Sequence, residues 1–293
     1  MRRFGESPSS LAQNPAVVAL ALECCVVDEA EAARIGALRL ERLVVLGQQA
    51  WDAQLALALS PSLRTVEVVR ARLTAACVAP LAGHASLSTV SLTEVKLGLP
   101  GAIAVADALR SGWRVRSLTL RAARLTVSGL QHIAAALPAP ALEELDVGGN
   151  YAYIAVDAFA AALLRDTKLR RLGLSYCSVL DGRSLGAALR ANNTLRELDL
   201  SGNPRMHLTI PRCAVAYAIE SAPGLLRLSL ACTEMRAHDL AIVARSLARS
   251  SLEWVDVSGH NLPVAPWSSV PATKLTPEDA RLYLKRNRLA AVA

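Results

Sequence analysis

Three aspartates recur at one position of a repeated sequence pattern, and a column of carboxylates is a candidate metal site or acid–base pair. Asp146, Asp199 and Asp256 each follow the central apolar residue of their copy of the pattern. The copies that carry them alternate with copies that do not. On strands about 4.8 Å apart, the carboxylates would therefore be too distant to share a proton or a metal ion. We interpret them as part of a solvated polar face and expect no metal site.

Other side chains with catalytic potential fit no recognised motif. The histidines belong to no HExxH helix and to no recognisable nucleophile motif, and the phosphate-binding pattern GxxxxGK[ST] is absent. The cysteines form no CxxC pair, so we predict reduced thiols. We therefore predict a protein that is not an enzyme and has no cofactor and no small-molecule substrate. The histidines are His84, His132, His207, His238 and His260, and the cysteines are Cys24, Cys25, Cys77, Cys177, Cys213 and Cys232.

The elements that would position these residues come from an internal repeat. Residues 142–150 read LEELDVGGN and residues 195–203 read LRELDLSGN. The shared frame is an apolar residue, two free positions, an apolar residue, one free position, an apolar residue, and then two free positions and a small polar residue. A near-constant interval of 23 to 30 residues indicates stacked repeats. The frame begins at Leu40, Leu63, Leu87, Val115, Leu142, Leu169, Leu195, Leu225 and Leu252.

The sequence of each repeat predicts a strand followed by a helix. The frame alternates apolar and polar residues, which predicts a strand with one buried face. Between frames, residues 127–137, 156–166, 182–193 and 238–250 place apolar side chains at helical spacing. We expect one continuous α/β domain with nine parallel strands, in which each repeat buries its apolar face against its neighbours. Leu145, Leu172, Leu198 and Leu228 should share one core column.

The last position of the frame holds Asn150 and Asn203 in the two most regular repeats. An asparagine amide there can satisfy backbone groups of the turn that lack partners. The early repeats are the most degenerate, and the first two are short, so their helices should be brief. The other occupants of this position are Gln48, Ala71, Val95, Ala123, Cys177, Thr233 and His260.

The segments LTVSGLQHIAAAL before LEELDV, and RSLGAALRANNTLRELDLSGN, resemble the ribonuclease-inhibitor-like class of leucine-rich repeat proteins. The resemblance covers residues 38–262. It implies a horseshoe-shaped solenoid with strands on the concave face and helices on the convex face. We expect residues 1–37 to form an N-terminal arm and helical cap, with residues 11–37 helical. Residues 263–293 should form a Pro-rich segment and a capping helix that begins at Thr276.

Proteins of such folds commonly present the concave face to other proteins. The residues that flank the central apolar residue of each strand should point to that face. In the early repeats they are mostly hydroxyl side chains, namely Thr65, Thr89, Ser91, Ser117 and Thr119. In the later repeats they are mostly charged, with one large aromatic. The predicted protein-binding residues are Glu144, Asp146, Arg171, Glu197, Asp199, Arg227, Trp254 and Asp256.

Two alternatives to a protein-binding scaffold stay open, one from the resemblance and one from composition. Proteins that activate the Ran GTPase are built on this repeat class, so the resemblance implies a regulator of this kind, with polar loop residues such as Arg121 and Arg124. The formal net charge of +7 permits an RNA-associated assembly component, with Arg165, Lys168, Arg170 and Arg171 as the basic patch. The face lacks the interleaved aromatic and basic residues typical of single-strand binding, so nucleic acid is the less favoured partner.

The expected location is the cytoplasm, with a cytoskeletal or ciliary assembly proposed by analogy. The N-terminal sequence MRRFGESPSS leaves mitochondrial import as an alternative. The longest apolar run, residues 16–27, is interrupted by Glu23 and is shorter than the roughly 20 residues that a membrane span needs. We therefore expect no membrane partner.

Overall fold

The computed structural model describes residues 17–150, 156–165, 167–179, 183–204, 222–234 and 250–259, together with the single residues 220 and 246. The predicted Pro-rich segment and capping helix, residues 263–293, lie outside these ranges. So does most of the predicted helix at 238–250, as do the arm up to residue 16 and the side chains of Cys213, His207, His238 and His260.

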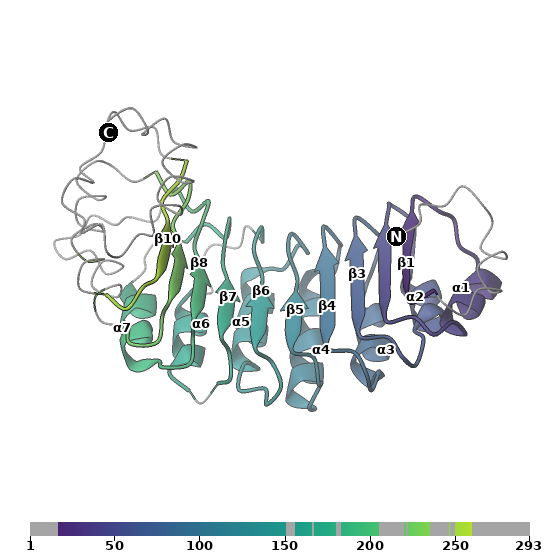
Figure 1. Ribbon diagram of the computed structural model, residues 1–293, viewed down its shortest axis with the longest axis horizontal. Coiled ribbons are helices and arrows are strands. Elements are labelled where there is room, and N and C mark those ends of the chain that lie inside the picture. Colours follow the sequence, from purple (N-terminus) through teal and green to yellow (C-terminus); the bar gives the residue numbers. More distant parts are fainter. Residues whose placement is uncertain are drawn as a thin grey trace. The chain divides into compact units, whose positions relative to one another are not determined.

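Within the described residues, ten parallel strands follow one another in chain order (Figure 1). Nine of them begin two residues after the first apolar residue of a predicted frame, which confirms those nine positions. The strands are β1 (Ala19–Glu23), β2 (Arg42–Leu46), β3 (Thr65–Val69), β4 (Thr89–Thr93), β5 (Ser117–Thr119), β6 (Glu144–Asp146), β7 (Arg171–Gly173), β8 (Glu197–Asp199), β9 (Arg227–Ser229) and β10 (Trp254–Asp256).

Strand β1 corrects the prediction that residues 11–37 are helical. Leu20 pairs with Leu43 of β2 and Leu22 pairs with Val45, and both β1 leucines are only 3% exposed. The two alanines of β1 favour a helix by intrinsic propensity, but strand pairing and burial of the two leucines outweigh that weak preference. Residues 17–36 are therefore an additional repeat, because Val17 begins the same frame.

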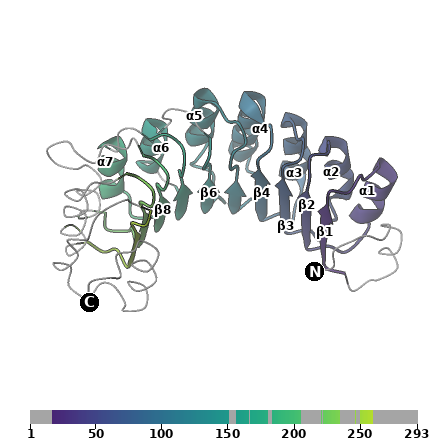
Figure 2. The same cartoon turned by 90° about the horizontal axis from the view of Figure 1, so that it is seen from above.

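The described helices lie on one face of the sheet in each part of the chain (Figure 2). In α1, the Asp28 carboxylate accepts a hydrogen bond from the Glu31 amide, and the Glu31 carboxylate accepts one from the Asp28 amide. The helices of the next two repeats are brief, as predicted. The helical segments are α1 (Glu29–Gly36), α2 (Asp52–Ala58), the 3-10 turn η2 (Ala75–Cys77), α3 (Val78–Gly83), α4 (Gly98–Arg110), α5 (Val127–Ala135), α6 (Val156–Leu163) and α7 (Arg183–Ala191).

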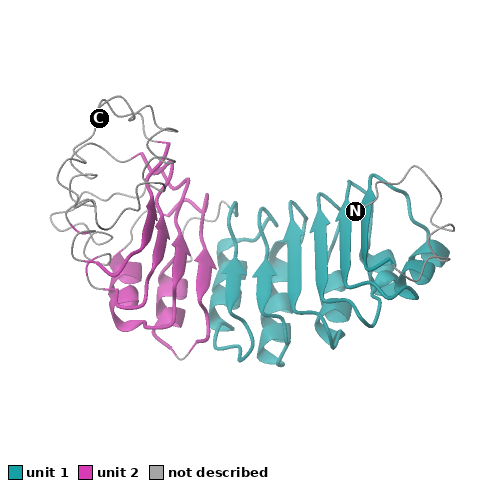
Figure 3. Cartoon of the chain, viewed as in Figure 1, with its two compact units in different colours: residues 1–150 teal, residues 151–293 magenta. Residues whose placement is uncertain are grey.

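The chain forms two compact units, residues 1–150 and 151–293, and the boundary falls inside the predicted repeat domain at 38–262 (Figure 3). In the second unit, Leu172, Leu198 and Leu228 are aligned across β7, β8 and β9. In the first unit, Leu145 is aligned with Leu118. All four predicted column leucines are at most 2% exposed, so their burial is confirmed.

Candidate protein-interaction face

The eight predicted binding residues lie at the first and third positions of β6 to β10, while the middle residue of each strand is buried. These positions point to the open face, which is the face of the sheet turned away from the described helices (Figure 2). Each of the eight is exposed or half-buried. Glu144 and Asp146 belong to the first unit, and the second unit holds Arg171, Glu197, Asp199, Arg227, Trp254 and Asp256.

The second unit brings four of these residues into one row. Arg171, Glu197, Arg227 and Trp254 are register partners on β7, β8, β9 and β10. Glu197 lies between the two arginines, and each arginine Nε is 3.6 Å from one of its carboxylate oxygens. The arginine side chains are 60% and 59% exposed, so each contact should contribute only about 0–1 kcal/mol. The row is therefore a charged surface. Its ion pairs can rearrange at little cost in free energy.

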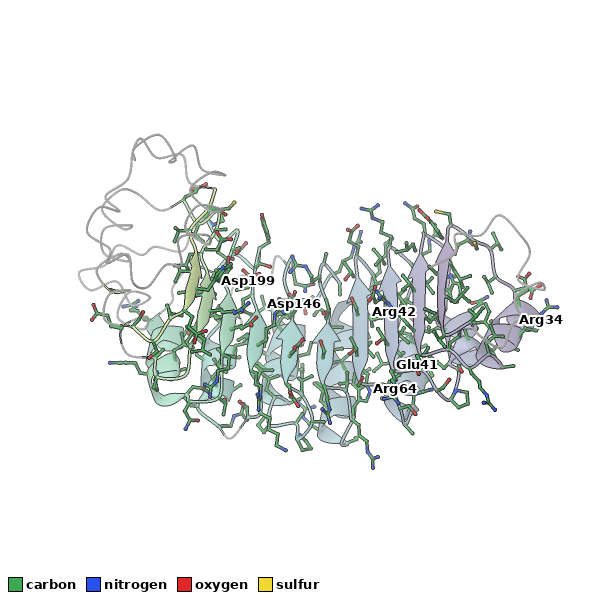
Figure 4. The ribbon with its side chains drawn as sticks, viewed as in Figure 1. Arg34, Glu41, Arg42, Arg64, Asp146 and Asp199 are labelled. Carbon is green, nitrogen blue, oxygen red and sulfur yellow. The ribbon has the colours of Figure 1, made fainter. Side chains whose placement is uncertain are left out.

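The three aspartates of the second row have a structural role. Asp146, Asp199 and Asp256 each accept, through Oδ1, a hydrogen bond from the backbone amide two residues ahead, at 2.8 to 2.9 Å. Such contacts tighten the turn that follows each strand. Asp146 also accepts from Arg121 Nη1 at 2.9 Å, and Asp199 accepts from the Ser201 hydroxyl (Figure 4). Within the described ranges, no group of His, Cys, Asp or Glu side chains is arranged to hold a metal ion.

The first unit has a different open face. Its outward positions on β3, β4 and β5 are mostly the predicted hydroxyl side chains, all half-buried. Its charges are satisfied locally, since Arg42 Nη2 lies 2.7 Å from Glu67 Oε1 and the Ser117 hydroxyl donates to Glu144 Oε2 at 2.9 Å. Glu144 is thus tied to the hydroxyl face of its own unit rather than to a charged row.

The two asparagines of the frame are buried, and each side-chain amide both accepts and donates hydrogen bonds. Asn150 accepts from the Leu125 amide and donates to the carbonyls of Leu120 and Val147. Asn203 accepts from the amides of Cys177 and Val179, both at 3.0 Å, and donates to the carbonyls of Leu174 and Leu200. The predicted role of the asparagine is confirmed at both positions.

One regularity of the turns was missed at the sequence level. The fifth residue after the start of every described strand has a positive φ, although only some of these residues are glycine. An added Cβ on Gly202 would overlap the ring of Tyr176, which is the equivalent residue one repeat earlier. Tyr176 is 46% exposed and adds an aromatic to the edge of the open face. The ten residues are Cys24, Gly47, Arg70, Glu94, Ala122, Gly149, Tyr176, Gly202, Cys232 and Gly259.

The basic residues predicted for GTPase activation and those predicted for RNA binding lie in different parts of the structure. Arg121 is engaged by Asp146, whereas Arg124 is exposed in the turn after β5 with a φ of 56°. The basic patch proposed for RNA lies at the start of β7, where Arg165, Lys168 and Arg170 are exposed.

The chain matches no family model and no curated protein. Its likeness to leucine-rich repeat proteins therefore rests on the repeated sequence frame and on the order and pairing of the strands.

Cys77 and His84 take part in the local structure around them. Burial, and then the negative charge of Asp52, raise the pKa of the Cys77 thiol to about 12, so this thiol stays protonated at neutral pH. The Nε2 atom of His84 lies 2.8 Å from the Ser60 carbonyl, which is a contact within the turn structure. In the part of the chain that is described, no helix is long and apolar enough to cross a membrane.

Proposed function

We propose that this protein is a non-enzymatic scaffold that binds one or more proteins through the open face of its second unit. It would be a leucine-rich repeat protein of the ribonuclease-inhibitor-like class, with that face as the concave side of a horseshoe. Parallel strands alternating with helices, and buried asparagines at the turns, support this class. By analogy with repeat proteins of larger assemblies, the proposed setting is a cytoplasmic structure, cytoskeletal or ciliary.

The observation that carries the proposal is the row Arg171, Glu197, Arg227 and Trp254. These side chains are not among the buried core residues. The core is filled by the next residue of each strand, namely Leu172, Leu198, Leu228 and Val255. Tryptophan and arginine are the residues that most often dominate binding energy at protein interfaces. A row of alternating charge beside an aromatic offers a partner both ion pairs and apolar contact.

The partner is to be captured with the full chain from its native cell and identified by mass spectrometry. Trp254→Ala and Arg227→Ala should each weaken the partner by about 2 kcal/mol, or roughly 30-fold in Kd, with thermal unfolding unchanged. Thr89→Ala, on the hydroxyl face of the first unit, is the matched control and should bind like the native protein. Lower stability with unchanged affinity for Trp254→Ala would make the tryptophan a packing residue and overturn the assignment of the face.

A further inference from the structure

A hollow of about 740 Å³ lies in the first unit, where β1, β2 and β3 end. Three consecutive repeats line it with the residues that finish each strand and begin the following turn. It is distinct from the row of the second unit, and a ligand bound in it would be independent of the proposed function. We call it the β1–β3 hollow, and its principal lining residues are Cys24, Leu46, Gln48, Val69, Arg70 and Arg72.

The turn after β2, which lines the hollow, lacks the buried asparagine found after β6 and β8. Gln48 occupies the asparagine position, but its side chain is exposed and makes no hydrogen bond within the described residues. The preceding Gly47 has a φ of 143°, and a Cβ added there would lie 3.2 Å from Cys24 Cα. The turn therefore keeps the backbones of β1 and β2 close while its centre stays unfilled.

Two of the lining residues are arginines whose guanidinium groups keep N–H donors without a described acceptor. Arg70 donates only through Nε, to Glu94 Oε2 at 2.8 Å, which leaves Nη1 and Nη2 without a bond among the described residues. Arg72 is exposed, and its guanidinium makes no ion pair or hydrogen bond in the described ranges. Its backbone is fixed, because its amide donates to the Gln49 carbonyl and its carbonyl accepts from the Trp51 amide. Both arginines thus belong to the turn after β3, two residues apart, and the backbone of that turn is held by the turn after β2.

The charges and the walls of the hollow limit the ligand. Leu46 and Val69 are half-buried and give an aliphatic wall. Glu23, the lining carboxylate, is on β1, two strands from the arginines, or roughly 10 Å away by strand spacing. The nearer Glu94 carboxylate is paired with Arg70 Nε, so Arg72 supplies the cation that has no described counter-ion. The planar guanidinium group suits the two oxygens of a carboxylate. We propose that the β1–β3 hollow binds a carboxylate at Arg70 and Arg72, with the aliphatic part of the ligand against Leu46 and Val69.

Cys24 provides a readout inside the hollow, and Cys232 provides a matched control. Both thiols are free and exposed, and both stand at the same turn position of their repeats. The full chain is alkylated with iodoacetamide at pH 8, and each site is followed by fragment mass spectrometry with and without N-acetylglutamate. At a ligand concentration equal to Kd, the rate of alkylation of Cys24 should fall about twofold, and the rate at Cys232 should stay unchanged. Added salt should reduce the protection, because exposed charges are screened.

Two substitutions test whether the arginines cause the protection of Cys24. Arg72→Gln should abolish most of the protection of Cys24. Arg64→Gln removes an exposed arginine from the opposite end of β3 and should leave the protection intact (Figure 4). No protection at any concentration up to saturation of solubility would overturn the proposal. So would equal protection by the neutral N-acetylglutaminamide, or protection that survives Arg72→Gln together with Arg70→Gln.

The carboxylate has two possible sources, a free small acid or an acidic side chain of another protein. A blocked peptide with alternating glutamate and alanine, which has no free terminus, separates them. Protection by the peptide at lower concentration than by N-acetylglutamate indicates an acidic protein segment. Protection by N-acetylglutamate alone indicates a small acid. Either result supports carboxylate binding, and both are independent of whether Trp254 and Arg227 bind a protein.

Discussion

After β8 the chain turns around a buried asparagine, and after β2 it turns around an exposed glutamine. Asn203 is 0% exposed and bonds to backbone groups of two repeats. Gln48 makes no such bonds in the described residues, and a hollow lies beside it. A glycine with positive φ precedes both residues, with a φ of 65° at Gly202 and 143° at Gly47. The two turns therefore differ in backbone as well as in the side chain that follows, and Asn203 fills one turn while a hollow lies beside Gln48 in the other.

The largest expected loss of stability comes from the buried leucines that the strands before both turns share. Leu198→Ala in β8 and Leu43→Ala in β2 each delete a fully buried leucine under the turn and leave a cavity. Each should lower the free energy of unfolding by about 2–5 kcal/mol, measured by urea denaturation. A Leu43→Ala variant as stable as the native protein would show that the repeat around the open turn is not packed like the later one.

The next effect separates the filled turn from the open one. Asn203→Ala removes partners from the amides of Cys177 and Val179 and from two carbonyls, all of them buried. A buried backbone group without a partner costs about 1–3 kcal/mol, and water entering the vacated space recovers part of the loss. We expect a loss of about 2–4 kcal/mol in the free energy of unfolding. A loss below about 1 kcal/mol would mean that the asparagine does not hold the turn.

The sequence predicted these features unevenly, for physical reasons. The nine strands and the role of Asn150 and Asn203 followed from a period and from the hydrogen-bonding capacity of an amide. Strand β1 was missed because alanine and leucine favour a helix by intrinsic propensity, and only pairing with β2 outweighs that preference. The regular frame places Gln48 with the asparagines, but does not say that a longer side chain turns outward. The hollow therefore needed the structure.

A smaller effect distinguishes backbone conformation from available space. Gly202 and Gly112 both have positive φ, but an added Cβ meets the Tyr176 ring at Gly202 and nothing within 4 Å at Gly112. Each alanine substitution should cost about 1–2 kcal/mol for the left-handed conformation alone. Gly202→Ala should cost measurably more. In the background of Tyr176→Ala the excess should disappear, and an excess that persists there would assign the crowding to another contact.

The smallest effect is expected at Gln48 itself, and it is the most informative about the open turn. Gln48→Ala removes an exposed side chain that bonds to no described residue, so the free energy of unfolding should change by less than about 0.5 kcal/mol. Comparison of this change with the loss expected for Asn203→Ala measures how differently the side chain at this frame position contributes to stability in the two repeats. Alkylation of Cys24 without ligand should also be unchanged, since Cys24 is already exposed. A loss above about 1 kcal/mol would mean that Gln48 fills its turn in solution as Asn203 does, and the β1–β3 hollow would then be closed.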